Sequence, residues 1–511
     1  MTERSSGILL HITSLPGNYG VGTLGHEAYK FVDDLKNAGQ TYWQILPIGP
    51  VSSVFGYSPY SSNSTFAGSE LFISLEKLAA DGLVDLTASD IFPDEHFCDF
   101  ERAEAFKKPH LEKAAERFFA SAAYKKDEYE LFCRESSDWL EDYSLFASVS
   151  EFYNTTDWTV WDKDISLHEK KAVTEWSTKL QKKIQFYNFT QYIFFKQWME
   201  LKEYCADKGI KIIGDIPIYI TLEGAAAWAH PEVLQLDSKT GLPLEVAGVP
   251  PDYFSETGQR WGNPLYRWFD SKGGLNEPTY LWWKRRVAHL SALVDIVRID
   301  HFRGFESYWA IPYTEKTAIK GKWIKGPGFD FFKRLKAELG DLPLIAEDLG
   351  VITPEVETLR DSMNLPGMKI LQFAFDFNNK NSYLPNNYDN PNCFVYTGTH
   401  DNNTTNGWFY EGEIDKETQE YILDYIGSDS FSDFHIKLIK LAYRSTARTV
   451  IIPAQDVLGF GKDFKMNKPG TVNYNWRWKL TSSCFRDEHI QMLKKYCDMY
   501  NRIPENKSIK G

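Results

Sequence analysis

Eight short apolar runs recur along this chain, and each ends in polar residues and a turn signal. The runs are GILLHITSL (7–15), YWQILPIGP (42–50), IKIIGDIPIYI (210–220), VDIVRIDHF (294–302), LPLIAEDLG (342–350), GMKILQFAF (367–375), CFVYTGTHD (393–401) and TVIIPAQDVL (449–458). Runs that are mainly apolar, without regular polar alternation, are typical of strands that are covered on both faces. The pattern therefore predicts eight buried strands.

Helical patterns precede most of these runs. Residues 25–39 lead into the second run and close with Gly39, and residues 188–209 lead into the third and close with Gly209. Glycine at such positions is typical of a helix C-terminus. Strands and helices that alternate eight times indicate a parallel sheet, and eight strands close a (β/α)₈ barrel. We predict an α/β fold of the TIM-barrel type.

An open, doubly wound sheet is the alternative fold. It requires a glycine-rich phosphate turn after the first strand, and GVGTLG (20–25) resembles that GxGxxG pattern. No acidic residue closes the second run, however, as the dinucleotide-binding pattern requires. The sequence therefore favours the barrel.

The spacing of the runs predicts insertions in the barrel, which would lie on its C-terminal face, where TIM-barrel active sites are built. Charged helical patterns fill the long interval between the second and third runs, and a segment rich in Gly, Pro and aromatic residues follows the third. We expect the barrel to start in 1–70, a helical subdomain and a barrel helix in 71–205, the third strand in 206–220, a lid in 221–275, and the remaining strands with a C-terminal helix in 276–511.

Composition excludes several classes of partner. The chain has 57 basic and 70 acidic residues, a net charge of −13, which repels nucleic acid and anionic lipid. Its six cysteines include no CxxC pair, and no short-spaced histidine cluster accompanies them. We therefore expect no metal, cofactor or disulfide, and a cytoplasmic location. The N-terminus lacks a signal-peptide pattern, and no apolar run is long enough to span a bilayer.

Carboxylates stand at the ends of five runs, where parallel strands of a closed barrel would bring them to one mouth. A helix cap or a loop hydrogen bond explains one acidic strand end, but a ring of like charges is costly unless function requires it. Arg298 and His400 lie among these acids, and the acids themselves are Asp215, Asp300, Glu347, Asp401 and Asp456.

Two kinds of chemistry use carboxylates on successive barrel strands. An enolase-type metal site also wants a lysine or histidine base, and no lysine ends these runs. Glycoside hydrolysis or transfer needs one ionised and one protonated carboxyl group, which fits this inventory better. Arg298 and Asp300 lie two apart on one strand face, so we expect the arginine to bond Asp300 and hold it ionised.

Several of these motifs resemble those of a known family. VRIDHFRG (297–304), IAEDLG (345–350) and TGTHDN (397–402) resemble conserved regions of the α-amylase superfamily. Four further motifs resemble those of the 4-α-glucanotransferases, called amylomaltases or disproportionating enzymes (glycoside hydrolase family 77). These are FGYSPYSSNSTFAG (55–68), GDIPIYI (214–220), GVPPDYFSETGQRWGNPLY (248–266) and DVLGFGKDFKMNKPGTVNYNW (456–476).

The resemblance implies a retaining reaction through a covalent glycosyl-enzyme. Asp300 would be the nucleophile, Glu347 the general acid and base, and Asp401 a brace for the transition state, with His400 beside it as a neutral donor. Retention implies that the carboxyl groups of Asp300 and Glu347 lie about 5–5.5 Å apart.

The resemblance also implies a set of substrate contacts. Tyr60 would stack on a sugar ring in the donor subsite, and Gln259 and Trp261 would lie in a loop that arches over the cleft. An Asx turn is the structural alternative for Asp215. Tyr474 departs from the family pattern, in which glycine is common at that position. The full set of implied contacts is Ser58, Tyr60, Asp215, Gln259, Trp261, Arg298, His301, Asp348, His400 and Asn467.

Transfer of α-1,4-glucan segments between maltooligosaccharides is the activity that the resemblance implies. A retaining α-glucan hydrolase would use the same three acids, so this alternative stays open. A carbohydrate-binding protein without catalytic activity would not need Asp300, Glu347 and Asp401 together.

Overall fold

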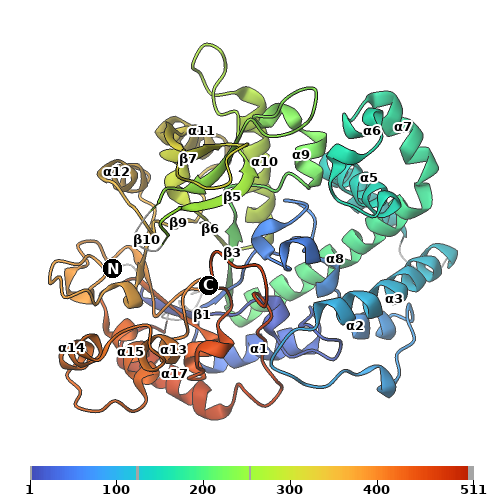
Figure 1. Cartoon of the computed structure of the whole chain (residues 1–511). Coiled ribbons are helices and arrows are strands. Elements are labelled where there is room, and N and C mark those ends of the chain that lie inside the picture. The colour runs from blue at the N-terminus through green and yellow to red at the C-terminus, as the bar shows by residue number, and fades with distance from the viewer. Residues whose placement is uncertain (1–2, 122–125, 252–254, 504–511) are drawn as a thin grey trace, which may run out of the picture.

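The computed structural model describes residues 3–121, 126–251 and 255–503, so part of the 248–266 motif, residues 252–254, lies outside the described residues. Its core is an eight-stranded parallel sheet with the order β10-β11-β12-β1-β2-β3-β6-β9 (Figure 1). The strands are β1 (Ser5–Leu9), β2 (Tyr42–Gln44), β3 (Lys211–Ile216), β6 (Ile296–Ile299), β9 (Leu344–Ala346), β10 (Gly367–Ile370), β11 (Cys393–Tyr396) and β12 (Thr449–Pro453).

The sheet closes on itself between β9 and β10. The backbone N–H of Ala346, the last residue of β9, donates to the carbonyl of Pro366, which directly precedes β10 (2.9 Å). The predicted (β/α)₈ barrel is therefore confirmed, and the open doubly wound sheet is wrong. All eight predicted runs contribute a strand, in the predicted order.

Each strand is shorter than the apolar run that predicted it. The run 210–220 contributes only Lys211–Ile216, and the run 294–302 contributes only Ile296–Ile299. The residues that follow leave the sheet and form loops at its carboxyl edge. This edge is where the polar residues at the ends of the runs lie.

Amphipathic helices cover the outside of the barrel. In α1, Ala28, Phe31, Val32 and Leu35 form a buried stripe at helical spacing. Gly39 and Gly209 adopt the left-handed conformation after α1 and α8, as predicted. The helices of the barrel wall are α1 (His26–Asn37), α8 (Gln181–Lys208), α10 (Glu277–Leu293), α11 (Gly328–Leu339), α12 (Pro354–Ser362), α13 (Thr405–Tyr410), α14 (Lys416–Ile426), α15 (Phe434–Arg444), α16 (Ala454–Val457) and α17 (Asp487–Met499).

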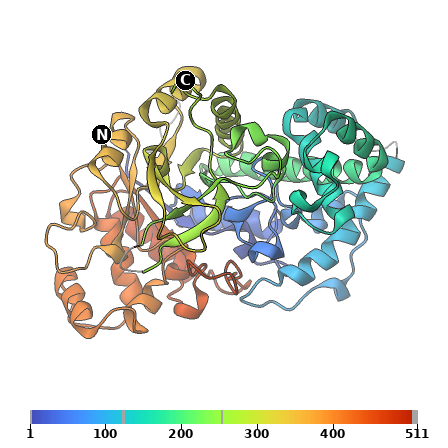
Figure 2. The same cartoon turned by 45° about the horizontal axis from the view of Figure 1, so that its top comes forward.

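The interval between β2 and β3 forms a helical lobe at one side of the barrel (Figures 1 and 2). Aromatic side chains hold it to α8: Phe118 packs on Phe189 (ring centroids 5.2 Å apart) and Trp139 packs on Phe195 (5.6 Å). Its helices are α2 (Leu75–Ala80), α3 (Phe100–Ala120), α4 (Lys126–Glu135), α5 (Ser137–Tyr153), α6 (Lys163–Ser166) and α7 (Lys170–Lys179). No helix in the described ranges combines the length and apolar character that crossing a bilayer requires.

A second sheet, antiparallel and ordered β5-β4-β7-β8, lies beside the barrel (Figure 1). The described residues of the expected lid region form α9 (Ala225–Ala229), β4 (Glu245–Val249), β5 (Gln259–Pro264) and a short 3-10 helix (Pro231–Val233). The hairpin β7 (Ser307–Pro312) and β8 (Lys322–Lys325) was not predicted, because β8 is short and largely exposed. Trp309 and Trp323 face each other across this hairpin with ring centroids 5.2 Å apart.

Candidate active site

Asp300 and Glu347 occupy matching positions on neighbouring strands. In the parallel pair of β6 and β9, Ile299 lies opposite Ala346, and each acid is the next residue. The backbone N–H of Glu347 donates to the carbonyl of Ile299 (3.0 Å), so the register continues to the strand ends. Neighbouring strands lie about 4.8 Å apart, so the two acidic residues are neighbours at the barrel mouth.

Arg298 joins Asp300 to the adjacent strand β3. Its Nη2 lies 2.9 Å from Asp300 Oδ1 and 2.8 Å from Asp215 Oδ2, and its Nε donates to the same Asp215 oxygen (3.1 Å). Asp215 pairs directly with Arg298 in the β3–β6 register. The predicted contact between Arg298 and Asp300 is present, and Asp215 is held by an ion pair and not by an Asx turn.

Tyr60 completes this charged group from the loop after β2. Its hydroxyl donates to Asp215 Oδ2 (2.6 Å). Ser58 accepts the N–H of Tyr60 through its hydroxyl (3.3 Å) and so shapes the short turn that presents the tyrosine. The Tyr60 ring stacks on His400 (5.1 Å, 15°), and Trp476 packs against both rings. Burial lowers the pKa of His400, which keeps its imidazole neutral at pH 7.

Backbone N–H groups donate hydrogen bonds to both carboxyl oxygens of Glu347. His301 N–H donates to Oε2 (2.6 Å) and Leu349 N–H donates to Oε1 (2.9 Å). Burial nevertheless raises the pKa of Glu347 to about 7, even though Arg298 and these two bonds lower it. The group is thus poised to gain and lose a proton near neutral pH.

Asp300 also has a raised pKa. Burial raises it and the neighbouring carboxylates raise it further, whereas Arg298 lowers it. Arg298 thus favours the ionised form of Asp300, while burial and the neighbouring carboxylates oppose it. Two adjacent carboxyl groups with raised pKa values titrate as a pair.

Asp401 is the most open of the three predicted catalytic acids, since 49% of its side chain is exposed. It follows β11 on a turn whose Asn402 side chain accepts the N–H of Thr399 (2.8 Å). Asn467 donates to Asp401 Oδ1 (2.7 Å), and His400 Nε2 lies 3.4 Å from Oδ2. The structure therefore brings Asn467 to the site.

His301 lies beside Asp300 in a strained backbone conformation, with φ at +50°. Its Nε2 is buried and has no hydrogen-bond partner among the described residues. Burial lowers its pKa to about 3, so the ring is neutral. Trp261 packs edge-on against it (4.9 Å), and the Trp261 indole donates to the side-chain oxygen of Gln259 (3.2 Å). Residues of β5 thus reach the barrel mouth.

Comparisons with known proteins agree with this geometry. The model of the 4-alpha-glucanotransferase family, glycoside hydrolase family 77, matches residues 10–484. The chain belongs to this family. It is 45% identical to the 4-alpha-glucanotransferase of Synechocystis and 44% identical to that of Thermus thermophilus, in each case over 98% of this chain and 99% of the relative. The amylomaltase of Streptococcus agalactiae, solved with acarbose, superposes with a TM-score of 0.92 at 37% identity, covering 98% of this chain and 100% of that one.

Two acids near strand ends of this glucanotransferase-family barrel make structural contacts outside the candidate active site. Asp348 pairs with Arg360 and accepts the N–H of Met368 (2.7 Å), so it braces the start of β10 and does not join the other predicted contacts. Asp456 accepts from the Thr397 hydroxyl (2.5 Å) and the Thr405 N–H (2.6 Å) and fixes the loop after β11. Both carboxylates are buried at structural junctions.

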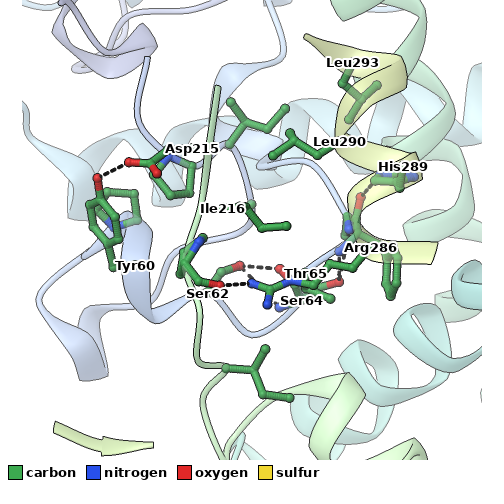
Figure 3. A pocket seen from close by; sticks show the side chains of 18 of the residues that line it. Tyr60, Ser62, Ser64, Thr65, Asp215, Ile216, Arg286, His289, Leu290 and Leu293 are labelled. Carbon is green, nitrogen blue, oxygen red and sulfur yellow. Dashed lines mark hydrogen bonds between the residues drawn. The ribbon is translucent and has the colours of Figure 1, made fainter. Parts of the chain in front are cut away.

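Arg286 is a buried residue next to the site that the motifs did not reveal. It donates to the Thr65 hydroxyl (2.5 Å) and to the carbonyls of Pro217 and Ile218. It thereby ties the segment after Tyr60 to the end of β3, and no carboxylate forms an ion pair with it among the described residues. Arg286, Asp215 and Tyr60 all line one cavity of about 60 Å³ (Figure 3). Only the structure identifies Arg286, because a lone arginine in an amphipathic helix carries no sequence signal.

Trp476 is the other neighbour that sequence motifs did not single out, although it closes the 456–476 motif. Its φ is +65°, a conformation uncommon for tryptophan, and its ring is buried against Tyr60 and His400. No group of three or more His, Cys, Asp or Glu residues in the described ranges could hold a metal ion.

Proposed function

We propose that this protein is a 4-α-glucanotransferase that moves α-1,4-glucan segments from one maltooligosaccharide to another. The adjacent placement of Asp300 and Glu347 in a member of this family carries the proposal. Retaining enzymes hold their two carboxyl groups about 5–5.5 Å apart for direct attack by one of them, whereas inverting enzymes need room for a water molecule between the two groups.

In the first half-reaction Asp300 attacks the anomeric carbon and Glu347 protonates the departing 4-oxygen. The bond from the anomeric carbon to that oxygen breaks as an ester bond to Asp300 forms. The two carboxyl groups share one proton before the reaction. Arg298 forms an ion pair with Asp300 and, among the described residues, none with Glu347, so the proton resides on Glu347.

In the second half-reaction the 4-hydroxyl of an acceptor glucan gives its proton to Glu347 and attacks the same carbon. The ester bond to Asp300 breaks, and configuration is retained after two inversions. Glu347 is the base here because it became ionised in the first step.

Asp401 and the residues around it bind sugar hydroxyls at the reacting ring. An exposed carboxylate oxygen is free to accept from hydroxyl groups, and Asn467 and the neutral His400 orient that carboxylate. Hydrogen bonds of this kind strengthen as positive charge develops at the anomeric carbon.

The remaining contacts define the donor side of the cleft. Tyr60 and Asp215 line it, with Ser58 positioning the tyrosine and Arg298 the aspartate. His301 Nε2 needs a hydrogen-bond partner, and a sugar hydroxyl beneath Trp261 and Gln259 supplies one. Asp348 acts indirectly, through the segment that follows Glu347.

Hydrolysis is the competing outcome of the same chemistry, with water in place of the acceptor. The experiment is incubation with pure maltotriose and analysis of products over time. A transferase produces glucose together with a ladder of longer glucans, and a hydrolase produces only shorter sugars.

We also infer that the protein works in the cytoplasm. All six cysteines are free thiols, and four of them are buried. A reducing compartment suits such a set.

A further inference from the structure

The loop from Asn467 to Trp476 has both ends in the site. Asn467 donates through its side chain to Asp401 (2.7 Å) and through its backbone to the carbonyl of His400 (3.1 Å). Trp476, at the other end, packs on Tyr60 (5.7 Å) and His400 (5.9 Å). Any ligand contact made by this loop is therefore made at the edge of the reaction centre.

Hydrogen bonds inside the loop fix its shape. The side chain of Asn475 accepts the N–H of Lys468 (3.0 Å) and donates to the carbonyl of Thr471 (2.8 Å). A loop ordered in this way loses little conformational entropy when it binds a ligand.

Tyr474 projects from this loop into solvent. Its side chain is 89% exposed, and its φ is +64°, in the left-handed region that favours glycine. An aromatic ring with almost no protein contacts contributes little to folding, and its backbone conformation adds strain. The chain thus holds a large apolar surface outward at a conformational cost.

The segment that leads to Tyr60 meets this loop and widens the apolar surface. A Cβ atom on Gly56 would lie 2.4 Å from the carbonyl oxygen of Val472, so the two segments are in direct contact. Val54 and Val472 are exposed beside that contact, at 68% and 60%. We name Val54, Val472 and Tyr474 the rim patch.

We propose that Tyr474 forms an outer sugar subsite that extends the cleft past Trp476, so that the enzyme prefers longer glucans. This rests on the proposed function. The apolar face of a glucose ring stacks on an exposed tyrosine, whose hydroxyl stays in water. Tyr474 and Trp476 are two residues apart, so their Cα atoms are separated by at most about 7 Å. A glucan bound at the reaction centre therefore needs only additional ring units to reach the rim patch.

The test compares donors of different length in Tyr474→Gly and Tyr474→Phe variants. Glycine removes the ring and suits the positive φ, so the loop keeps its shape. We expect kcat/KM for maltoheptaose to fall roughly two- to tenfold in Tyr474→Gly, while that for maltotriose stays unchanged. Tyr474→Phe keeps the ring and should retain both values. Phe152→Ala, which removes an exposed ring of α5 in the helical lobe, is the matched control.

Equal losses for both donors, or no loss for either, would overturn the outer subsite. A second experiment tests the outer subsite independently of the proposed function. Calorimetry measures the binding of maltoheptaose and maltotriose to Asp300→Asn, with and without Tyr474→Gly. If Tyr474→Gly weakens the binding of maltoheptaose and leaves that of maltotriose unchanged, the outer subsite is supported, even if the protein proves to be a hydrolase. An unmodified protein that forms no longer glucans from maltotriose contradicts the transferase proposal instead.

Discussion

The guanidinium of Arg298 lies 2.9 Å from the carboxylate of Asp300, two residues further along the same strand end. The same guanidinium pairs with Asp215 on the neighbouring strand, and its side chain is only 4% exposed. One buried cation therefore compensates two carboxylates, the buried Asp215 of β3 and the partly exposed Asp300 at the end of β6. The nucleophile and the donor subsite depend on the same residue.

Replacing Arg298 should damage both activity and stability. Removing one partner of a buried ion pair leaves uncompensated charge, so we expect Arg298→Met to lower the free energy of unfolding by about 3 kcal/mol. Because Asp300 would then hold its proton to higher pH, the acidic limb of the kcat profile should shift upward. Denaturant unfolding and the pH profile measure the two effects. Arg334→Met, which breaks a surface pair with Glu277, should change neither by a comparable amount.

Glu347→Gln should lose activity and change how the stability of the protein depends on pH. Transfer should fall by roughly a thousandfold or more, since the acid and base of both half-reactions are removed. The raised pKa of Glu347 means that the folded state binds its proton more tightly than the unfolded state does. The destabilisation caused by ionising the buried Glu347 carboxyl is therefore absent below about pH 4.5 and grows as the pH rises to about 7.

Glutamine has one accepting oxygen where Glu347 has two, so one of the two backbone N–H groups loses its acceptor in Glu347→Gln at every pH. We thus expect the melting temperature of Glu347→Gln, taken relative to that of the unmodified protein, to be higher at pH 8 than at pH 4. Thermal unfolding at the two pH values measures this, with circular dichroism to confirm the fold. A difference in melting temperature between the two proteins that is the same at pH 4 and pH 8 would contradict a raised pKa of Glu347 in the folded state.

The pH dependence of kcat/KM should have a descending limb near pH 7. Glu347 must carry its proton when the glycosidic bond breaks, and burial sets its pKa at about 7 in the free enzyme. Initial rates with maltoheptaose over pH 5 to 9 should show this limb. A rate that is flat up to pH 9 would assign the acid to another group.

Arg286 should position the donor subsite without touching substrate. Arg286→Met leaves the carbonyl of Pro217 without its donor, whereas the Ile218 carbonyl keeps the hydrogen bond from the Tyr266 hydroxyl. A group left unpaired in this way costs about 1–3 kcal/mol. We expect a higher KM for short donors, because Tyr60 and Asp215 lose their common anchor. Arg286→Lys should restore part of the stability.

Arg285 is the natural control for Arg286. It is the preceding residue on α10, is more exposed, and contacts Asp138 of the helical lobe. Arg285→Met should leave KM unchanged. A KM that stays at the unmodified value in Arg286→Met, with lower stability, would assign Arg286 a purely structural role.

The barrel itself could be predicted because its signal repeats along the chain. Each strand is largely buried, so most of its residues are apolar, as in Ile296–Ile299, where Arg298 is the one charged residue. The hairpin of β7 and β8 could not be predicted in the same way. β7 is largely buried and also pairs with β4, but β8 has only four residues, most of them exposed, and such a short segment has no distinctive periodicity.

The site was predictable where side-chain direction follows from strand register, as for Arg298, Asp300 and Glu347. Beyond the strand end, register no longer applies. Asp348 directly follows Glu347 in sequence yet pairs with Arg360, and His301 lies in a left-handed conformation that no strand pattern implies. Long-range contacts such as those of Arg286 depend on which helix covers which loop, and only the folded structure shows that.

The two backbone N–H groups that clamp Glu347 leave its carboxyl little freedom to rotate. In the proposed reaction, the fixed carboxyl group of Glu347 protonates the 4-oxygen of the leaving glucan and later takes the proton from the 4-hydroxyl of the acceptor glucan. Both oxygens therefore pass through the same point in space, and an incoming chain can enter only after the outgoing one has vacated it. Because donor and acceptor oxygens use the same position, glucan transfer is equally feasible in both directions. Prolonged incubation should therefore drive the glucan lengths toward an equilibrium distribution set by mass action.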